Sequence, residues 1–92
     1  MKFMTTWSAK PEILREAVGR FLAGQGTPVA GVTLLGRWQS ADLSGGFSLF
    51  ESDNPVAIFE TAAVWADLLD LKTTLVVEDA DAGPVLAKVF SK

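Results

Sequence analysis

The clearest polar pattern in this chain surrounds Arg37. Arg37 and Gln39 are two residues apart in a segment rich in β-forming residues, so both side chains point to one face of a strand. Ser48 lies in a second such segment a short turn later. A guanidinium on a half-buried sheet face can hold a carboxylate or phenolate through paired N–H donors. A structural ion pair, or an exposed position on an edge strand, explains Arg37 equally without a ligand.

Aromatic and hydroxyl side chains extend this set of candidates. Tryptophan and phenylalanine rings stack on planar ligands, and a threonine hydroxyl can donate or accept a hydrogen bond beside Ser48. The same residue types also fill the core of a small domain or occupy ordinary strand positions. Trp38 is expected on the helix side of the sheet, and a one-residue change of register would move it to the pocket. The predicted ligand-binding residues are Arg37, Gln39, Ser48, Phe50, Thr6 and Trp38.

The residue types that are absent narrow the possible chemistry. The chain has no Cys, His or Tyr, so it offers no thiolate, no imidazole base and no phenol. No base lies near Thr6, Ser48 or Thr74 in sequence, so a serine nucleophile is unsupported. We therefore predict no metal site and no cofactor, and we leave open whether the protein is an enzyme.

Length and charge limit the number of domains and the kinds of partner that the protein can have. The 92 residues predict a single domain over 1–92 with a small core. The net charge is −3 and the eight Lys and Arg residues are scattered, which disfavours nucleic acid and anionic membranes as partners. No apolar run is long enough to span a membrane, and the first residues lack a signal peptide's apolar region. The expected location is the cytoplasm.

The positions of apolar residues, Gly and Pro predict the elements that hold these side chains. Strands are expected over 2–8, 32–39, 46–51 and 71–77, from alternation and β-branched runs. Helices are expected from Pro11 to the glycines at 24 and 26, and from Pro55 to Leu69. A last short helix should hold Val85 to Phe90, with Asp79 or Asp81 capping it and Pro84 in its first turn.

This element order predicts an α+β ferredoxin-like fold, βαββαβ with a four-stranded antiparallel sheet plus a C-terminal helix. Right-handed crossovers place both main helices on one face of the sheet, so the other face is open. An open apolar face invites a second copy, which makes a homodimer through that face the expected partner. We expect Phe3, Val32, Phe47 and Leu75 to face the helices. The expected open-face residues are Met4, Leu35, Phe50 and Val76, joined by Thr6, Arg37, Gln39, Ser48 and Thr74.

The segments M-K-F-M-T-T-W, L-L-G-R-W-Q-S-A-D-L-S-G-G-F-S-L-F-E, V-V-E-D and A-K-V-F resemble a family of small bacterial proteins known only as a domain of unknown function. That family resembles the dimeric α/β-barrel superfamily, in which two ferredoxin-like subunits pair sheet to sheet. The superfamily includes cofactor-independent monooxygenases, haem-degrading enzymes, lactone isomerases and stress-response proteins. Haem-binding members generally use a histidine ligand, which this chain lacks.

Two functions of different classes follow from the residues and the resemblance. The first is a dimeric protein that binds a small apolar or aromatic ligand, between sheet and helices or within the dimer barrel. The alternative is a cofactor-independent monooxygenase- or isomerase-like enzyme acting on an aromatic or lactone substrate. In that alternative, Arg37 would stabilise negative charge on the substrate and Gln39 or a tryptophan would orient it.

Overall fold

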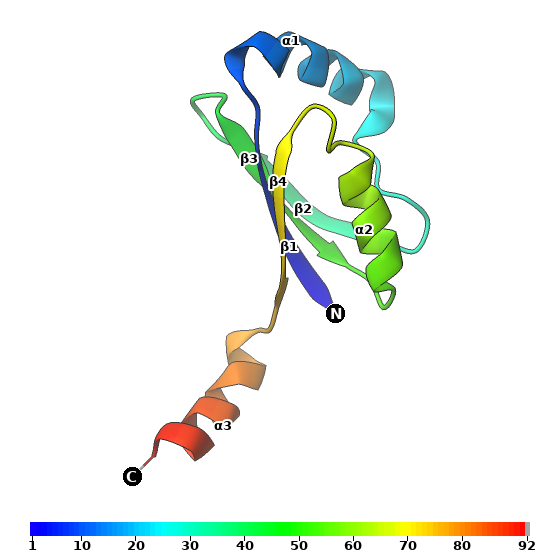
Figure 1. Ribbon diagram of the computed structural model, residues 1–92. Coiled ribbons are helices and arrows are strands. Elements are labelled where there is room, and N and C mark those ends of the chain that lie inside the picture. The colour runs from blue at the N-terminus through cyan, green and yellow to red at the C-terminus, as the bar shows by residue number, and fades with distance from the viewer. Residues whose placement is uncertain (92) are drawn as a thin grey trace.

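The computed structural model describes residues 1–91 and has the predicted ferredoxin-like order (Figure 1). Its four strands form one antiparallel sheet in the order β2-β3-β1-β4. The strands are β1 (Lys2–Ser8), β2 (Thr33–Gln39), β3 (Gly45–Glu51) and β4 (Asp70–Val76). The helices are α1 (Pro11–Arg20), followed by a π-helical turn η1 (Phe21–Gln25), α2 (Pro55–Ala63) and α3 (Asp79–Phe90).

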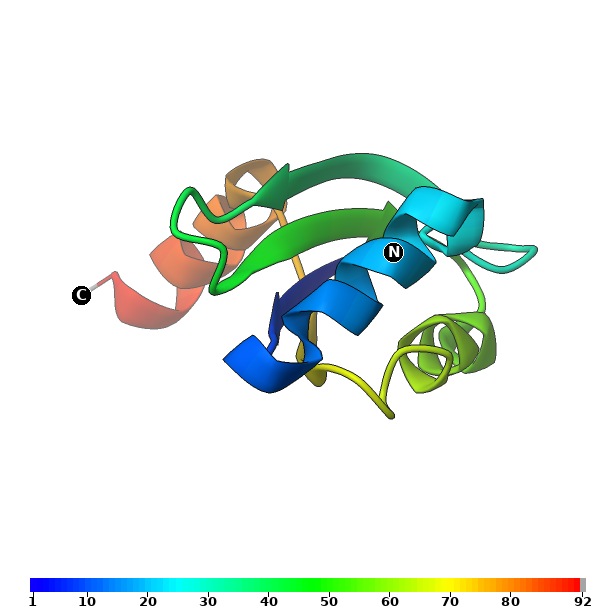
Figure 2. The ribbon, with the colours of Figure 1, turned by 90° about the horizontal axis from the view of Figure 1, so that it is seen from above.

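The helices α1 and α2 lie on the same side of the sheet, as Figures 1 and 2 show. Pro11 occupies the start of α1, where its missing N–H and fixed φ are tolerated. In the turn η1 that follows α1, Gly24 adopts a φ of 89°, a left-handed conformation that interrupts the helix. Asn54 caps α2, because its Oδ1 accepts a hydrogen bond of 3.0 Å from the backbone N–H of Val56.

Two helix boundaries differ from the prediction. The helix α2 ends at Ala63 rather than Leu69, and the chain continues in short turns. There the carbonyl of Val64 accepts a hydrogen bond of 3.0 Å from Arg20. The helix α3 begins at Asp79, so Pro84 lies inside it and the Asp79 side chain belongs to the first turn rather than to a cap.

A β-bulge in β2 decides which of its side chains face the helices. Leu34 pairs with Phe50, but the next pair is Gly36 with Leu49, so one residue is inserted in β2. Beyond the bulge, Arg37 faces the helices and Trp38 faces the opposite side, where its ring is 57% exposed. The expectation that Trp38 faces the helices was therefore wrong, because the bulge reverses the alternation.

The strand β3 also has the opposite orientation to the one predicted. Ser48 and Phe50 are buried on the helix side, whereas Phe47 is exposed on the other side with Leu49. Both faces of β3 carry large apolar side chains, so its alternation does not reveal which face is inward. We call the uncovered side the open face. It presents the apolar residues Met4, Trp38, Phe47, Leu49 and Val76, together with Thr6, Thr74, Lys2 and Lys72.

The core between the sheet and the helices is thin. Phe3, Phe50 and Ile58 form its buried cluster, and Val32 and Leu34 pack against it in part. No side chain of residues 1–91 falls below 2% exposure. The close backbone contacts of the domain lie mainly between strands, so the helices stand away from most of the sheet.

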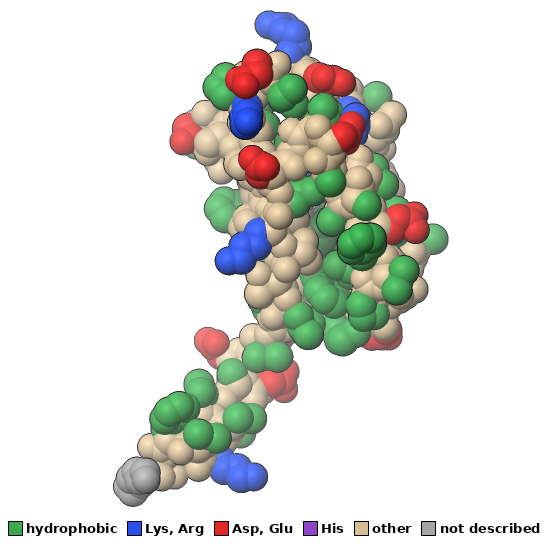
Figure 3. All heavy atoms as spheres, viewed as in Figure 1, with side chains coloured by type: hydrophobic (Ala, Val, Ile, Leu, Met, Phe, Trp, Pro, Cys, Tyr) green, Lys and Arg blue, Asp and Glu red, His purple; other side chains and the backbone are tan. Residues whose placement is uncertain are grey.

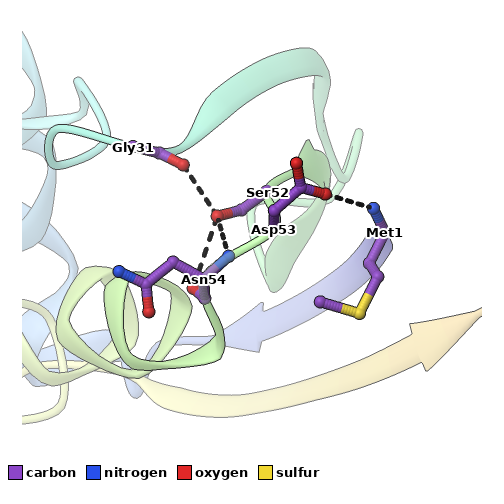
Figure 4. Close-up of polar contacts among 5 residues, drawn as sticks. All are labelled: Met1, Gly31, Ser52, Asp53 and Asn54. Carbon is purple, nitrogen blue, oxygen red and sulfur yellow. Dashed lines mark hydrogen bonds and ion pairs between the residues drawn. The ribbon is translucent and has the colours of Figure 1, made fainter.

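A buried serine, Ser52, connects the end of β3 to the start of α2 (Figure 4). The Oγ of Ser52 donates a hydrogen bond of 2.7 Å to the carbonyl of Gly31 and accepts one of 3.0 Å from the N–H of Asn54. The adjacent Asp53 lies 3.6 Å from the N-terminal amine of Met1. These contacts fix the start of α2 relative to β2 and β1, and therefore hold one end of the space beneath the helices.

The C-terminal helix α3 extends away from this body (Figure 1). It makes the molecule 53 Å long and raises the radius of gyration to 15.6 Å, compared with about 12 Å for a compact domain of this length. No residue of α3 is buried. Within the part of the chain described, no helix is both long enough and apolar enough to cross a membrane.

Replacing Gly45 by Ala is expected to destabilise the protein by about 1–3 kcal/mol, as overpacking typically does. A Cβ on Gly45 would lie 1.8 Å from the carbonyl oxygen of Trp7, which is backbone and cannot turn aside. Gly19 in α1 has open space around it, so Gly19→Ala should instead stabilise by up to about 1 kcal/mol. Urea unfolding of both variants measures the two effects, and equal stabilities would contradict this account.

Candidate ligand site between the sheet and the helices

A cavity of about 150 Å³ lies between the sheet and its helices. Its walls come from all four strands, from α1, η1 and α2, and from the connections between them. Most of the lining is apolar, with the rings of Trp7, Phe21, Phe50 and Trp65 among it. The cavity exists because the helices stand away from the sheet and the side chains beneath them do not fill the space.

Arg37 carries the only ionisable side chain among the residues that line this cavity. Its Nη2 donates a hydrogen bond of 2.6 Å to the carbonyl of Gly26, and its Nε donates one of 3.4 Å to Ser48 Oγ. The guanidinium also lies over the ring of Phe21, 5.5 Å from the centroid. Arg37 is therefore held from three sides and its position is fixed.

No carboxylate of residues 1–91 lies within 4.0 Å of this guanidinium. Burial lowers the pKa of Arg37 from its usual value, although arginine remains protonated in proteins. The group thus brings a positive charge to a largely apolar cavity without a negative partner from the described chain. Its two hydrogen bonds use two of the five N–H donors that a guanidinium has, which leaves donors for an external acceptor.

The other polar groups of the cavity have different roles. Thr5 and Thr73 share a hydrogen bond of 2.8 Å between their hydroxyls, and Thr61 donates to the carbonyl of Ala57. These hydroxyls are satisfied within the protein. Gln39 lines the cavity from the exposed end of β2, two residues beyond Arg37. Its amide can therefore reach a ligand that enters from solvent.

A second arginine lies beside Trp65, one of the residues that line the cavity. Arg20 at the end of α1 makes paired hydrogen bonds of 3.0 and 2.9 Å to the carboxylate of Asp67. It also lies 5.4 Å from the centre of the Trp65 ring. Hydrogen bonding with Arg20 lowers the pKa of Asp67, and the same contact raises the pKa of Arg20. This pair fastens α1 to the chain that follows α2.

The structure brings together four of the six predicted site residues. Arg37, Gln39, Ser48 and Phe50 all line the cavity, although on the helix side rather than on the open face where they were expected. Thr6 and Trp38 lie on the open face, so the structure separates them from the other four. Side chains alternate between the two faces along β1. Thr5 points to the helix side, so its neighbour Thr6 points to the open face.

The sequence reasoning missed several residues that line this site. Trp7 and Trp65 line the cavity but were not among the predicted ligand-binding residues. The Arg20–Asp67 pair, which lies outside the lining and holds the neighbouring segment of the chain, received no role. Arg20 and Asp67 are 47 residues apart, so no local periodicity connects them. The glycine-bearing loop at Gly26 did contain a signal. A Cβ there would lie 2.7 Å from the Phe21 ring and 3.0 Å from the Arg37 guanidinium, so the close approach requires glycine.

Comparisons with known proteins agree with the fold. The chain belongs to the family described as Domain of unknown function (DUF3303), whose profile matches residues 1–90. It is also similar to the structure of Rv0793 from Mycobacterium tuberculosis, with a TM-score of 0.50 and 12% sequence identity. The similarity covers 86% of this chain and 96% of that one. No curated protein matches the chain in sequence. At this identity the structural likeness concerns the fold alone.

Proposed function

We propose that this member of the DUF3303 family binds a small aromatic or apolar molecule with an acidic group, in the cavity between sheet and helices. The observation that carries the proposal is the charge of Arg37, which faces an apolar cavity without a carboxylate partner in residues 1–91. Arg37 is half-buried, and removing a charge from water even in part is less costly when the charge is paired. A carboxylate or phenolate ligand would supply the partner that the described chain does not.

The size of the cavity supports a ligand with one ring. A cavity of about 150 Å³ lined by apolar side chains holds benzene in a protein engineered to contain one, and the present cavity has a similar volume. Trp7, Phe21 and Trp65 provide ring faces and edges for stacking. A benzoate-like or phenylacetate-like molecule would place its ring among them and its carboxylate at Arg37.

The lining favours binding over the alternative of an isomerase- or monooxygenase-like enzyme. No Asp, Glu or Lys is among the residues around the cavity, so the chain supplies no general acid or base there. The catalytic contribution open to Arg37 is electrostatic stabilisation of an anionic substrate. We therefore place ligand binding first and keep a reaction driven by the substrate's own chemistry as the second candidate.

We also propose that two copies associate through the open face. Trp38 is 57% exposed and Phe47 47% exposed there, and Met4 and Leu49 lie beside them. The accessible surface is 6489 Å², about 1,300 Å² above the value expected for a compact monomer of this mass. That excess is larger than the ~800 Å² that each partner of a stable complex usually buries. A second copy is a partner that presents the same group of apolar side chains on its own open face.

The three tryptophans allow a direct test of the ligand site. Addition of benzoate or phenylacetate is expected to shift the indole N–H NMR signals of Trp7 and Trp65, because their rings line the cavity. The signal of Trp38 should not move, since it lies on the open face. Trp→Phe variants assign the three signals, and benzamide and phenylacetamide serve as neutral controls that should bind more weakly.

Two results would contradict the proposed site. Saturable shifts confined to Trp38 would place the acid on the open face instead of between sheet and helices. An equal response to the acids and to their neutral amides would show that Arg37 does not recognise negative charge. The same spectra recorded over a range of protein concentration report on association separately, since that process should move Trp38.

A further inference from the structure

The helix α3 is the least supported element of this fold. It has 12 residues and no buried side chain, and Gly83 and Pro84 lie in its interior. An isolated helix of this length is only marginally stable in water. An interior proline and glycine cost about 3 and 1 kcal/mol relative to alanine. Its own sequence therefore does not sustain this helix, which implies that packing against another surface stabilises it.

One side of α3 is suited to such packing. Val85, Leu86, Val89 and Phe90 are spaced so that they share one helix face, and each is 54–74% exposed. Asp81 and Lys88 border this face beside Val85, on the side away from Leu86 and Phe90. The space-filling view shows hydrophobic side chains along the length of this helix (Figure 3). The apolar face of α3 is thus continuous and has no cover within residues 1–91.

The junction with the sheet directs α3 away from its own body. The last residue of β4 pairs with Lys2 of β1, and the ammonium of Lys2 forms an ion pair with Glu78, the residue just before α3. This contact raises the pKa of Lys2 and lowers the pKa of Glu78. Figures 1 and 2 both show α3 displaced from the sheet in the direction away from α2. That is the side of the open face.

We infer that α3 packs its apolar face on a second copy of this chain. The inference rests on the proposed dimer, because a partner seated on the open face occupies the side toward which α3 points. The surface excess of about 1,300 Å² is more than the ~800 Å² per partner of a standard interface, so it accommodates both the sheet face and a helix. Each subunit then covers its neighbour with the helix that its own body leaves exposed.

Spin labelling tests this exchange directly, because the chain has no cysteine and a single one can be introduced. A nitroxide is attached to the cysteine of the Lys88→Cys variant, outside the apolar face of α3. This spin-labelled chain is then mixed with ¹⁵N-enriched wild type, which carries no nitroxide. We expect broadening of a contiguous set of amide signals on the ¹⁵N chain, which only an intermolecular contact produces. Broadening seen solely when label and ¹⁵N share one chain would show that α3 folds back, and would overturn the inference.

Matched variants separate packing from mere proximity. The double variant Leu86→Ser/Phe90→Ser should raise the dimer dissociation constant at least about tenfold, since large apolar residues at interfaces commonly contribute that much. The control Lys88→Ser should leave it unchanged. A dimer of unchanged affinity in the double variant would overturn the role of α3 and leave the sheet-to-sheet dimer standing. If wild-type protein sediments as a monomer, both the sheet-to-sheet dimer and the α3 contact are ruled out. The ligand proposal does not depend on that result, because it is tested by the indole signals alone.

Discussion

Replacing Phe47 by Asp is expected to disrupt the proposed dimer, so that the variant is a monomer at micromolar concentrations where two wild-type copies associate. Phe47 lies on the open face, on a central strand, and is 47% exposed in the single chain. A two-fold dimer contains this position twice, so the substitution removes two apolar anchors and buries two charges. With about 2 kcal/mol or more at each site, the dissociation constant should rise about 10³-fold or more.

Sedimentation velocity measures this change, and Ala41→Asp provides the control. Ala41 lies in the exposed turn between β2 and β3, so the same charge there should leave association unaffected. Circular dichroism establishes that both variants are folded, which is expected because Phe47 contributes little to the core beneath the helices. A Phe47→Asp protein that stays dimeric would show that the copies do not meet through the open face.

Replacing Arg37 by Met should weaken the binding of benzoate or phenylacetate about 10- to 100-fold. A hydrogen bond to a charged group contributes about 1.5–3 kcal/mol, and methionine keeps the unbranched shape without the charge. The affinity for the neutral amides should stay nearly constant, because the rings around the cavity are unchanged. This contrast between acid and amide distinguishes a lost charge from a damaged cavity.

Titration followed by the Trp7 and Trp65 indole signals measures both affinities. Arg15→Met is the control, since Arg15 is an exposed residue of α1 and its loss removes the same charge from the protein as a whole. The control should bind both ligands as the wild type does. If Arg37→Met binds the acids as strongly as before, the guanidinium serves only to hold the Gly26 loop to β2.

The sequence was sufficient to predict the fold because each element has a local cause. Alternation defined the strands within one residue at each end, and Pro11 and Asn54 marked the helix starts. The ends that were wrong depend on distant contacts. The helix α2 stops where Arg20, more than 40 residues earlier, binds the carbonyl of Val64. No periodic pattern contains that information.

The candidate site was predicted in part for a related reason. Arg37, Gln39, Ser48 and Phe50 lie together because a hairpin brings alternate residues of its two strands to one face. Their side of the sheet was wrong because a strand with apolar residues on both faces does not identify its inner face. Trp65 could not be placed, since its position depends on how the chain turns after α2.

The bulge between Leu34 and Gly36 makes β2 intolerant of changes in length. The outer half of this strand alternates between residues that face the cavity and residues that face the open side of the sheet, with Arg37 inward and Trp38 outward. Loss of the one inserted residue would exchange them, placing an indole in the cavity and a guanidinium on the apolar surface. Point substitutions in β2 can therefore change the cavity or the open face separately, whereas insertions and deletions would change both faces of the sheet together.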